Sequence, residues 1–107
     1  MTREGRVFGL ESIVSDVRKQ GGYFADFLKV RHIEAGVIVL KPGQKDTQAP
    51  HDSDELYYVV RGSGFIQLAA DNMGIGPGSI VFVPAKMKHR FCGNKDELVV
   101  LYVFAEE

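Results

Sequence analysis

Short apolar runs alternate with glycine- and proline-containing turns from residue 23 onward, and this pattern limits the fold more than any other feature of the sequence. Each run has the length and the β-branched or aromatic content of a strand. The expected strands span residues 23–33, 36–40, 56–60, 65–70, 79–83, 89–92 and 98–104, with turns at 34–36, 41–43, 62–64, 71–72, 76–78, 84–85 and 93–94. Because no helical pattern separates these runs, the sequence predicts an antiparallel all-β sandwich or barrel over about residues 23–105.

One short amphipathic helix is expected before the strands, at about residues 10–20. Apolar side chains recur there at i, i+3, i+4 and i+7, which is the spacing of one helix face. They are Leu10, Ile13, Val14 and Val17. The glycines at positions 21 and 22 are expected to end the helix.

Two of the expected strands, 37–40 and 98–104, are apolar on both faces. A strand with one face in water would alternate between apolar and polar residues, so both faces of these strands should be covered. One face should line the barrel, and the other should pack against the helix or a second subunit. We expect a homodimer to cover at least one of the two strands.

The chain has 107 residues, enough for one hydrophobic core, so we expect a single domain over residues 1–107. The chain has 13 basic and 14 acidic side chains, and the basic ones are not clustered in the sequence. Both observations argue against nucleic-acid binding. The longest apolar run, residues 98–105, is too short to cross a membrane, and the N-terminus lacks the apolar segment of a signal peptide. A single cysteine, Cys92, fits a reducing compartment, and we expect a cytoplasmic location.

The first candidate site residues are His51 and Glu55, which precede or begin a strand-like run. If the backbone is extended there, both share a face with Tyr57, and we assign that face to the interior. A buried glutamate is costly unless it is paired or bound to a cation, which favours a metal site over a solvated turn. Neutral imidazole and carboxylate suit a divalent transition metal such as zinc, iron, nickel, manganese or copper.

His89 supplies a second imidazole near the other end of the chain, and by itself it fits a buried structural histidine equally well. Phe91 shares its face and is expected, with Tyr57, to line the cavity. Cys92 has the opposite parity and is expected on the outer face.

Other polar and aromatic residues receive weaker assignments. His32, expected on a strand, could hydrogen-bond to a metal ligand, although a lone strand histidine is more often structural or at the surface. Tyr23 and Phe24 are expected in the core. The carboxylates of Asp46, Asp52 and Asp54 are expected in turns and loops at the barrel mouth.

The two histidine-containing segments resemble the two motifs of the cupin superfamily. From Gly43 to Gly62 the sequence is G-x5-A-P-H-x3-E-x6-G, whereas the first cupin motif is glycine, five residues, His-any-His, three or four residues, glutamate, six residues and glycine. From Gly78 to Asn94 it is G-x5-P-A-K-x2-H-x3-G-N, and the second motif has Pro-any-Gly before the histidine and an asparagine after it.

This resemblance implies a small double-stranded β-helix, or jelly-roll, barrel in which the two motifs face each other. His51, Glu55 and His89 would then be metal ligands. Cupins are commonly dimers, and they range from dioxygenases, isomerases and decarboxylases to storage proteins and sugar-binding regulators. The fold by itself therefore leaves the function open.

Two departures from the cupin pattern bear on the site: Ala49 replaces the first histidine, and Lys86 stands where glycine is usual. The remaining three ligands resemble the His-His-carboxylate set of non-haem iron oxygenases or a three-ligand zinc site. Alternatively, Gln48 substitutes as a ligand if Pro50 marks a bulge that turns it inward. As a third possibility, the cavity holds no metal and binds a ligand by shape and hydrogen bonds.

Two functions follow from these observations. The first is a metal-dependent enzyme, dioxygenase- or isomerase-like, acting on a small molecule in the barrel cavity. The second is a non-catalytic cupin that binds a small ligand as a sensor or carrier, with a degenerate or absent metal site.

Overall fold

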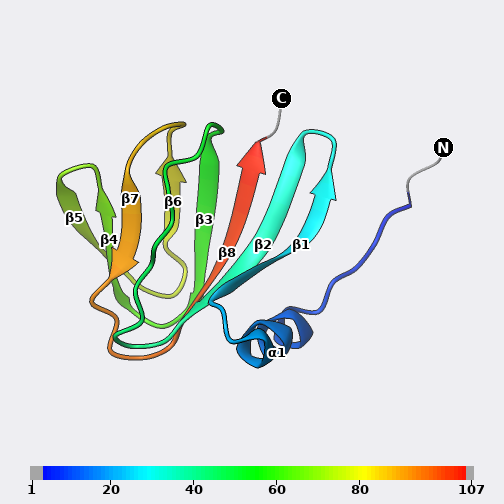
Figure 1. The fold of residues 1–107 in the computed structure, drawn as a ribbon, viewed down its shortest axis with the longest axis horizontal. Coiled ribbons are helices and arrows are strands. Elements are labelled where there is room, and N and C mark those ends of the chain that lie inside the picture. Colours follow the sequence, from blue (N-terminus) through cyan, green and yellow to red (C-terminus); the bar gives the residue numbers. More distant parts are fainter. Residues whose placement is uncertain (1–3, 106–107) are drawn as a thin grey trace.

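The computed structural model describes residues 4–105, which form one helix and eight strands (Figure 1). In chain order these are α1 (Leu10–Gln20), β1 (Phe24–Val30), β2 (Ile33–Leu40), β3 (Glu55–Arg61), β4 (Gly64–Leu68), β5 (Asp71–Ile75), β6 (Ile80–Val83), β7 (His89–Cys92) and β8 (Leu98–Ala105). The strands form a five-stranded sheet in the order β1-β2-β8-β3-β6 and a three-stranded sheet in the order β5-β4-β7. The predicted all-β double-stranded β-helix with one short N-terminal helix is confirmed.

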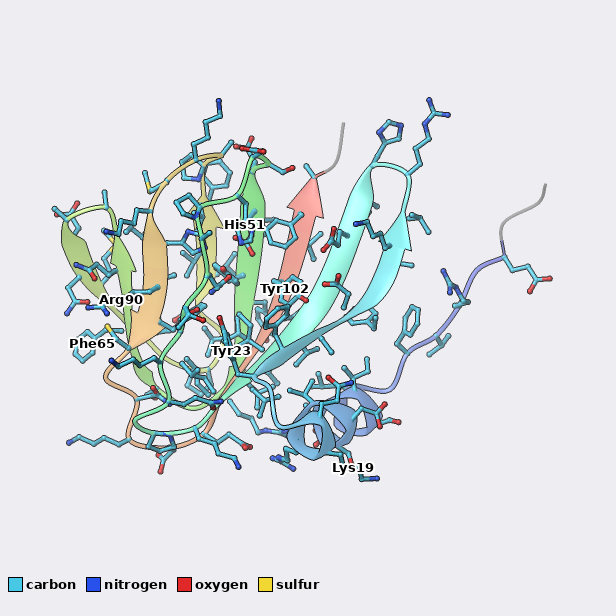
Figure 2. The ribbon with its side chains drawn as sticks, viewed as in Figure 1. Lys19, Tyr23, His51, Phe65, Arg90 and Tyr102 are labelled. Carbon is cyan, nitrogen blue, oxygen red and sulfur yellow. The ribbon has the colours of Figure 1, made fainter. Side chains whose placement is uncertain are left out.

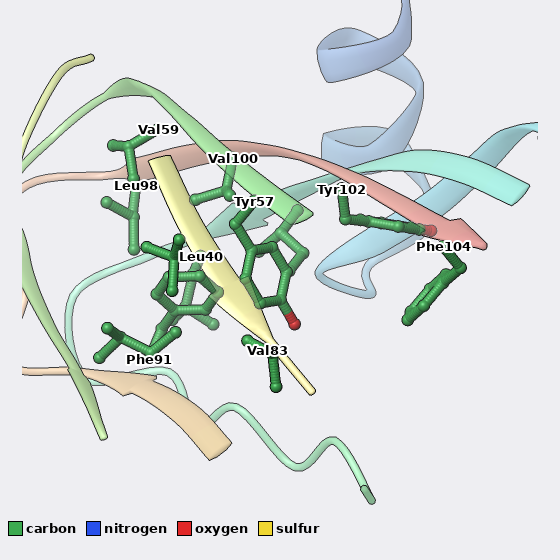
Figure 3. Close-up of a cluster of buried hydrophobic side chains, with 12 residues drawn as sticks. Leu40, Tyr57, Val59, Val83, Phe91, Leu98, Val100, Tyr102 and Phe104 are labelled. Carbon is green, nitrogen blue, oxygen red and sulfur yellow. The ribbon is translucent and has the colours of Figure 1, made fainter. Parts of the chain in front are cut away.

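The main core lies between the two sheets (Figure 3). On β3 and β7, and on β8 from Val100 onward, buried residues alternate with more exposed ones, as expected for strands with one inward face. The largest cluster contains Leu40, Tyr57, Val59, Phe91, Leu98, Val100, Tyr102 and Phe104 among its members. Phe91 comes from the small sheet, so this cluster joins the two layers.

The helix α1 covers the part of the outer face of the large sheet that β1, β2 and β8 form. Val14 and Val17 are fully buried there and pack against Val37, Val39 and Val99. Burying each valine contributes on the order of 1.5 kcal/mol or more. Both faces of β2 are therefore covered, as the sequence predicts, and the helix is what covers the outer one. α1 ends as expected at Gly21, which adopts the left-handed conformation with φ 81°. Within residues 4–105, no helix is long and apolar enough to cross a membrane.

The turn predicted at residues 34–36 is wrong, because these residues lie inside β2. The hairpin instead turns at residues 31–32, where His32 has φ 76° and Val30 pairs with Ile33. The glycine at position 36 suggested a turn, but glycine is needed there because its neighbours leave no room for a side chain. A Cβ atom at position 36 would collide with the hydroxyl group of Tyr102.

The turn predicted at residues 71–72 is also wrong, because β5 begins at Asp71. The chain reverses one step earlier, at residues 69–70, where Ala69 has φ 53°. The strand β5 pairs with β4 but is almost entirely exposed, so it shows no alternation of apolar and polar residues.

Candidate metal centre

His51 lies in the loop that joins β2 to β3, residues 41–54, and its imidazole is 35% exposed. The backbone there is not a strand, so the parity argument for His51 does not apply. Two hydrogen bonds hold the loop against the segment before β7. The amide of Lys86 donates to the carbonyl of His51 (2.6 Å), and the amide of Ala85 donates to Oδ1 of Asp54 (2.8 Å). His51 is therefore fixed beside the segment that leads to His89.

Glu55 and His89 are each the first residue of a strand, β3 and β7. Their side chains are only 1% exposed, and Nε2 of His89 lies 3.4 Å from Oε1 of Glu55. Nε2 of His51 lies 4.0 Å from the same oxygen. One ligand atom from each of the three residues lies within 4.8 Å of the others. The structure thus brings together the three residues that the sequence identifies, in an arrangement able to hold a metal ion.

The hydrogen bonds of His89 leave one ring nitrogen available to a metal. Nδ1 of His89 lies 2.9 Å from the carbonyl oxygen of Met87, which can only accept, so Nδ1 carries the hydrogen. Nε2 then presents its lone pair toward Glu55. At His51, burial and, secondarily, the neighbouring His89 lower the pKa, which favours the neutral imidazole that metals bind.

Glu55 is the least satisfied polar group of the core. Both carboxylate oxygens are buried, and neither has a hydrogen-bond partner within residues 4–105. Burial raises the pKa of Glu55 to about 8. The hydroxyl of Tyr57 lies 3.0 Å from both Nε2 of His89 and Oε1 of Gln48, and its one hydrogen can satisfy only one of them. The cluster has more lone pairs than hydrogens, so its composition fits a bound cation.

Tyr57 and Phe91 lie beside these residues, as predicted. Tyr57 is fully buried, and its ring packs edge-on against Phe91 with centroids 4.8 Å apart. Burial raises the pKa of Tyr57 far above its usual value, with Glu55 adding to the shift, so the phenol stays a neutral hydrogen-bond donor. Cys92, on the same strand as Phe91, is only partly buried, in line with its predicted outward parity.

Gln48 points toward the cluster, but not for the predicted reason. Residues 41–54 contain no strand, so no bulge at Pro50 is involved. Oε1 of Gln48 accepts a hydrogen bond from Tyr57 (3.0 Å) and lies 3.5 Å from Nε2 of His51. This 3.5 Å separation is similar to the distances of 3.4 Å and 4.0 Å from Oε1 of Glu55 to Nε2 of His89 and of His51.

Asp46 corrects a prediction in part: it lies in the loop, as expected, and lines the second cavity, but its carboxylate is buried. Its two oxygens accept hydrogen bonds from Tyr23, from the backbone and side chain of Gln48, and from the amide of Phe91. The sequence offers no signal for this role, because the donors from Tyr23 and Phe91 lie more than twenty residues away along the chain.

A cavity of about 470 Å³ opens beside His51. Tyr23, which is labelled with His51 in Figure 2, lies in its wall. Tyr102, Phe104 and Ala49 also line it, and Gln48 lines both this cavity and a second one of about 510 Å³ that reaches His89. The volume is in the range of small-molecule sites.

Two aromatic assignments need revision here. Phe24, predicted in the core, is 52% exposed and forms part of the cavity wall. Tyr23 packs partly on the core as expected, but its hydroxyl reaches Asp46. His32 is exposed in the β1–β2 turn, so it is not a buried neighbour of the candidate ligands.

A family model described as the cupin domain matches residues 36–104. The chain therefore belongs to the cupin family, as its motifs suggest.

Individual proteins are also similar to this chain. The chain is 33% identical over 100 residues to an uncharacterised protein of Streptomyces coelicolor, covering 94% of this chain and 95% of the relative. It is 30% identical over 93 residues to an acireductone dioxygenase of Leptospira biflexa, covering 83% of this chain but only 52% of that enzyme. An RmlC-like cupin of Methanocaldococcus jannaschii with a double-stranded β-helix fold superposes with a TM-score of 0.72 at 22% identity, covering 78% of each chain.

Proposed function

We propose that this cupin binds one divalent transition metal through His51, Glu55 and His89, and acts with it on a small molecule in the adjoining cavity. One observation carries the proposal: the buried carboxylate of Glu55 faces two imidazoles and has no hydrogen-bond donor among the described residues. A bound cation would remove the cost of burying that charge.

A metal held by two imidazoles and one carboxylate supplies a Lewis acid with open coordination positions. The protein's own groups orient the site. The bond from His89 to the Met87 carbonyl aims Nε2 inward, and Tyr57 holds a neutral hydroxyl donor next to it. The cavity brings the small molecule to His51.

The reaction we propose is dioxygenase-like, with an isomerase-like reaction as the other choice within the family. The likeness to an acireductone dioxygenase supports the first, although the chain spans only about half of that enzyme. We therefore use the substrate of that enzyme, an acireductone, as a probe for this protein and do not assign it as this protein's substrate.

A non-catalytic cupin that binds a small ligand is the second candidate function. Ala49 favours it, because this position lines the cavity where the family pattern has a histidine, and a methyl group cannot ligate. A weaker metal site could still help to bind a ligand without turning it over.

A homodimer is also part of the proposal. The outer face of β3 and β6 exposes a patch that α1 does not cover: Leu56, Tyr58, Ile80 and Phe82 are between 45% and 71% exposed. Leu56 pairs with Phe82 and Tyr58 with Ile80, so the four side chains are contiguous. We propose that the same patch of a second copy packs on it in an isologous contact.

Elemental analysis of protein purified without added metal tests the metal site. We expect about one transition-metal ion per chain in the wild type and strong loss in His51→Ala. Well under one ion per chain, together with unchanged metal content and melting temperature in His51→Ala, would refute the site. Oxygen consumption and product analysis of the metal-loaded protein with a synthetic acireductone then separate the two functions. Metal-dependent consumption of oxygen supports the dioxygenase-like enzyme, metal-dependent conversion without consumption supports the isomerase-like enzyme, and binding without conversion supports the ligand-binding cupin.

A further inference from the structure

The loop between β2 and β3 contains a buried carboxylate, Asp46, which is 9% exposed. Its Oδ1 accepts hydrogen bonds from the Tyr23 hydroxyl (3.1 Å) and from the backbone amide of Gln48 (3.2 Å). Its Oδ2 accepts from the side-chain Nε2 of Gln48 and from the backbone amide of Phe91, each at 2.8 Å. Half of these bonds go to Gln48, so Asp46 restrains that residue at both backbone and side chain.

The bond to Nε2 decides which end of the Gln48 amide faces the candidate metal centre. The two ends of a primary amide have nearly the same shape, but a carboxylate oxygen only accepts hydrogen bonds. With the amide reversed, two oxygens would meet and the bond would be lost. Nε2 therefore faces Asp46, and Oε1 faces Tyr57 and Nε2 of His51.

The bond to Phe91 ties the same carboxylate to the strand that carries His89. β7 is the edge of the three-stranded sheet and pairs with β4 on one side only. The amide of Phe91, two residues after His89, donates from this strand to Oδ2 of Asp46. Asp46 thus sets the position of Gln48 relative to both motif segments.

We propose that Asp46 is a positioning residue that presents Oε1 of Gln48 as a fourth, oxygen ligand, in place of the histidine that the family pattern has at position 49. The inference rests on the proposed metal site. It makes the ligand set two nitrogens and two oxygens. Asp46 then acts on metal binding only through Gln48.

A double-mutant cycle tests this dependence. Co²⁺ affinity and the visible absorption spectrum of the Co²⁺ form are measured for the wild type, Asp46→Asn, Gln48→Ala and the double variant. We expect each single change to weaken Co²⁺ binding by about 10- to 100-fold, as for residues that support a ligand, and to alter the spectrum. In the Gln48→Ala background, Asp46→Asn should have no further effect. Equal losses from Asp46→Asn in both backgrounds would overturn the proposal.

Asp96→Asn is the control, because Asp96 is an exposed carboxylate in the loop that follows β7, at the end of this strand opposite to His89. It should leave Co²⁺ affinity and spectrum unchanged. If Asp46→Asn does not fold, Gln48→Ala still decides: unchanged affinity and spectrum would overturn the proposal. No Co²⁺ binding by the wild type would instead refute the metal site itself.

Discussion

Nε2 of His89 lies 3.4 Å from Oε1 of Glu55, and both side chains are 1% exposed. Since the other nitrogen of His89 donates to the Met87 carbonyl, two lone pairs face each other in the core without a hydrogen between them unless Glu55 is protonated. In the metal-free protein this contact is unfavourable when Glu55 is ionised, and it becomes favourable once a cation lies between the two groups.

Glu55→Gln should therefore separate folding from metal binding. The amide removes a buried carboxylate and can donate to Nε2 of His89. Above pH 8, where Glu55 of the metal-free wild type is ionised, we expect the metal-free variant to be more stable than the wild type by on the order of 1 kcal/mol, and at any pH to lose most of its metal affinity. Urea unfolding with a chelator present measures the stability of the metal-free proteins, and Co²⁺ titration measures their metal affinity. A variant that is less stable without metal and binds Co²⁺ normally would contradict this role for Glu55.

The stability of the metal-free protein should fall as pH rises toward 8. Burial raises the pKa of Glu55 from its usual 4.5 to about 8, so the folded state keeps a proton that the unfolded state has released. That contribution is complete below pH 4.5 and is lost as pH rises through the folded pKa.

The lowered pKa of His51 acts in the opposite direction, and only near and below its usual value of 6.5. The slope between about pH 7 and 8 therefore reports mainly on Glu55. We expect urea midpoints to decrease over this range in the wild type and much less in Glu55→Gln. Equal slopes in the two proteins would count against a buried, protonated Glu55.

Gly36→Ala should destabilise the fold by about 1–3 kcal/mol, the usual cost of overpacking. The added methyl group would collide with the Tyr102 hydroxyl, which donates to Asp26, and would lie 2.5 Å from the carbonyl oxygen of Ala25. Gly74→Ala in β5 is the control, since the nearest atom to its new methyl is 4.0 Å away on Phe65. Urea unfolding of both variants measures the difference, and similar stabilities would show that the close packing at Gly36 is not required.

The apolar patch on β3 and β6 should hold the proposed dimer together. Ile80 is 71% exposed in the monomer, so Ile80→Glu adds a charge to the contact without disturbing the core. We expect light scattering at micromolar concentration to give a dimer mass for the wild type and a monomer mass for Ile80→Glu. Met73→Glu, on an exposed residue of the other sheet, should remain dimeric. A monomeric wild type would remove the dimer from the proposal.

The sequence predicts the positions of His51, Glu55 and His89 well because their spacing follows a family pattern, and because short strands leave few ways to connect the two segments. It fails where a residue's role depends on a distant partner. From the sequence Gly36 looks like a turn residue, and only the structure shows that Tyr102 packs against it. Asp46 looks like an ordinary loop carboxylate, and only the structure shows that it accepts a hydrogen bond from the amide of Phe91. The sequence does not predict β5 for another reason. This strand has no buried face, so apolar and polar residues do not alternate along it.

Anomalous X-ray diffraction from crystals of the Co²⁺-loaded protein, measured at the cobalt edge, tests the metal centre most directly. We expect a single strong anomalous peak between Nε2 of His51, Nε2 of His89 and a carboxylate oxygen of Glu55, at about 2.0–2.2 Å from each. No peak at this position, or a peak bound only by surface residues elsewhere, would contradict a metal centre in this cupin.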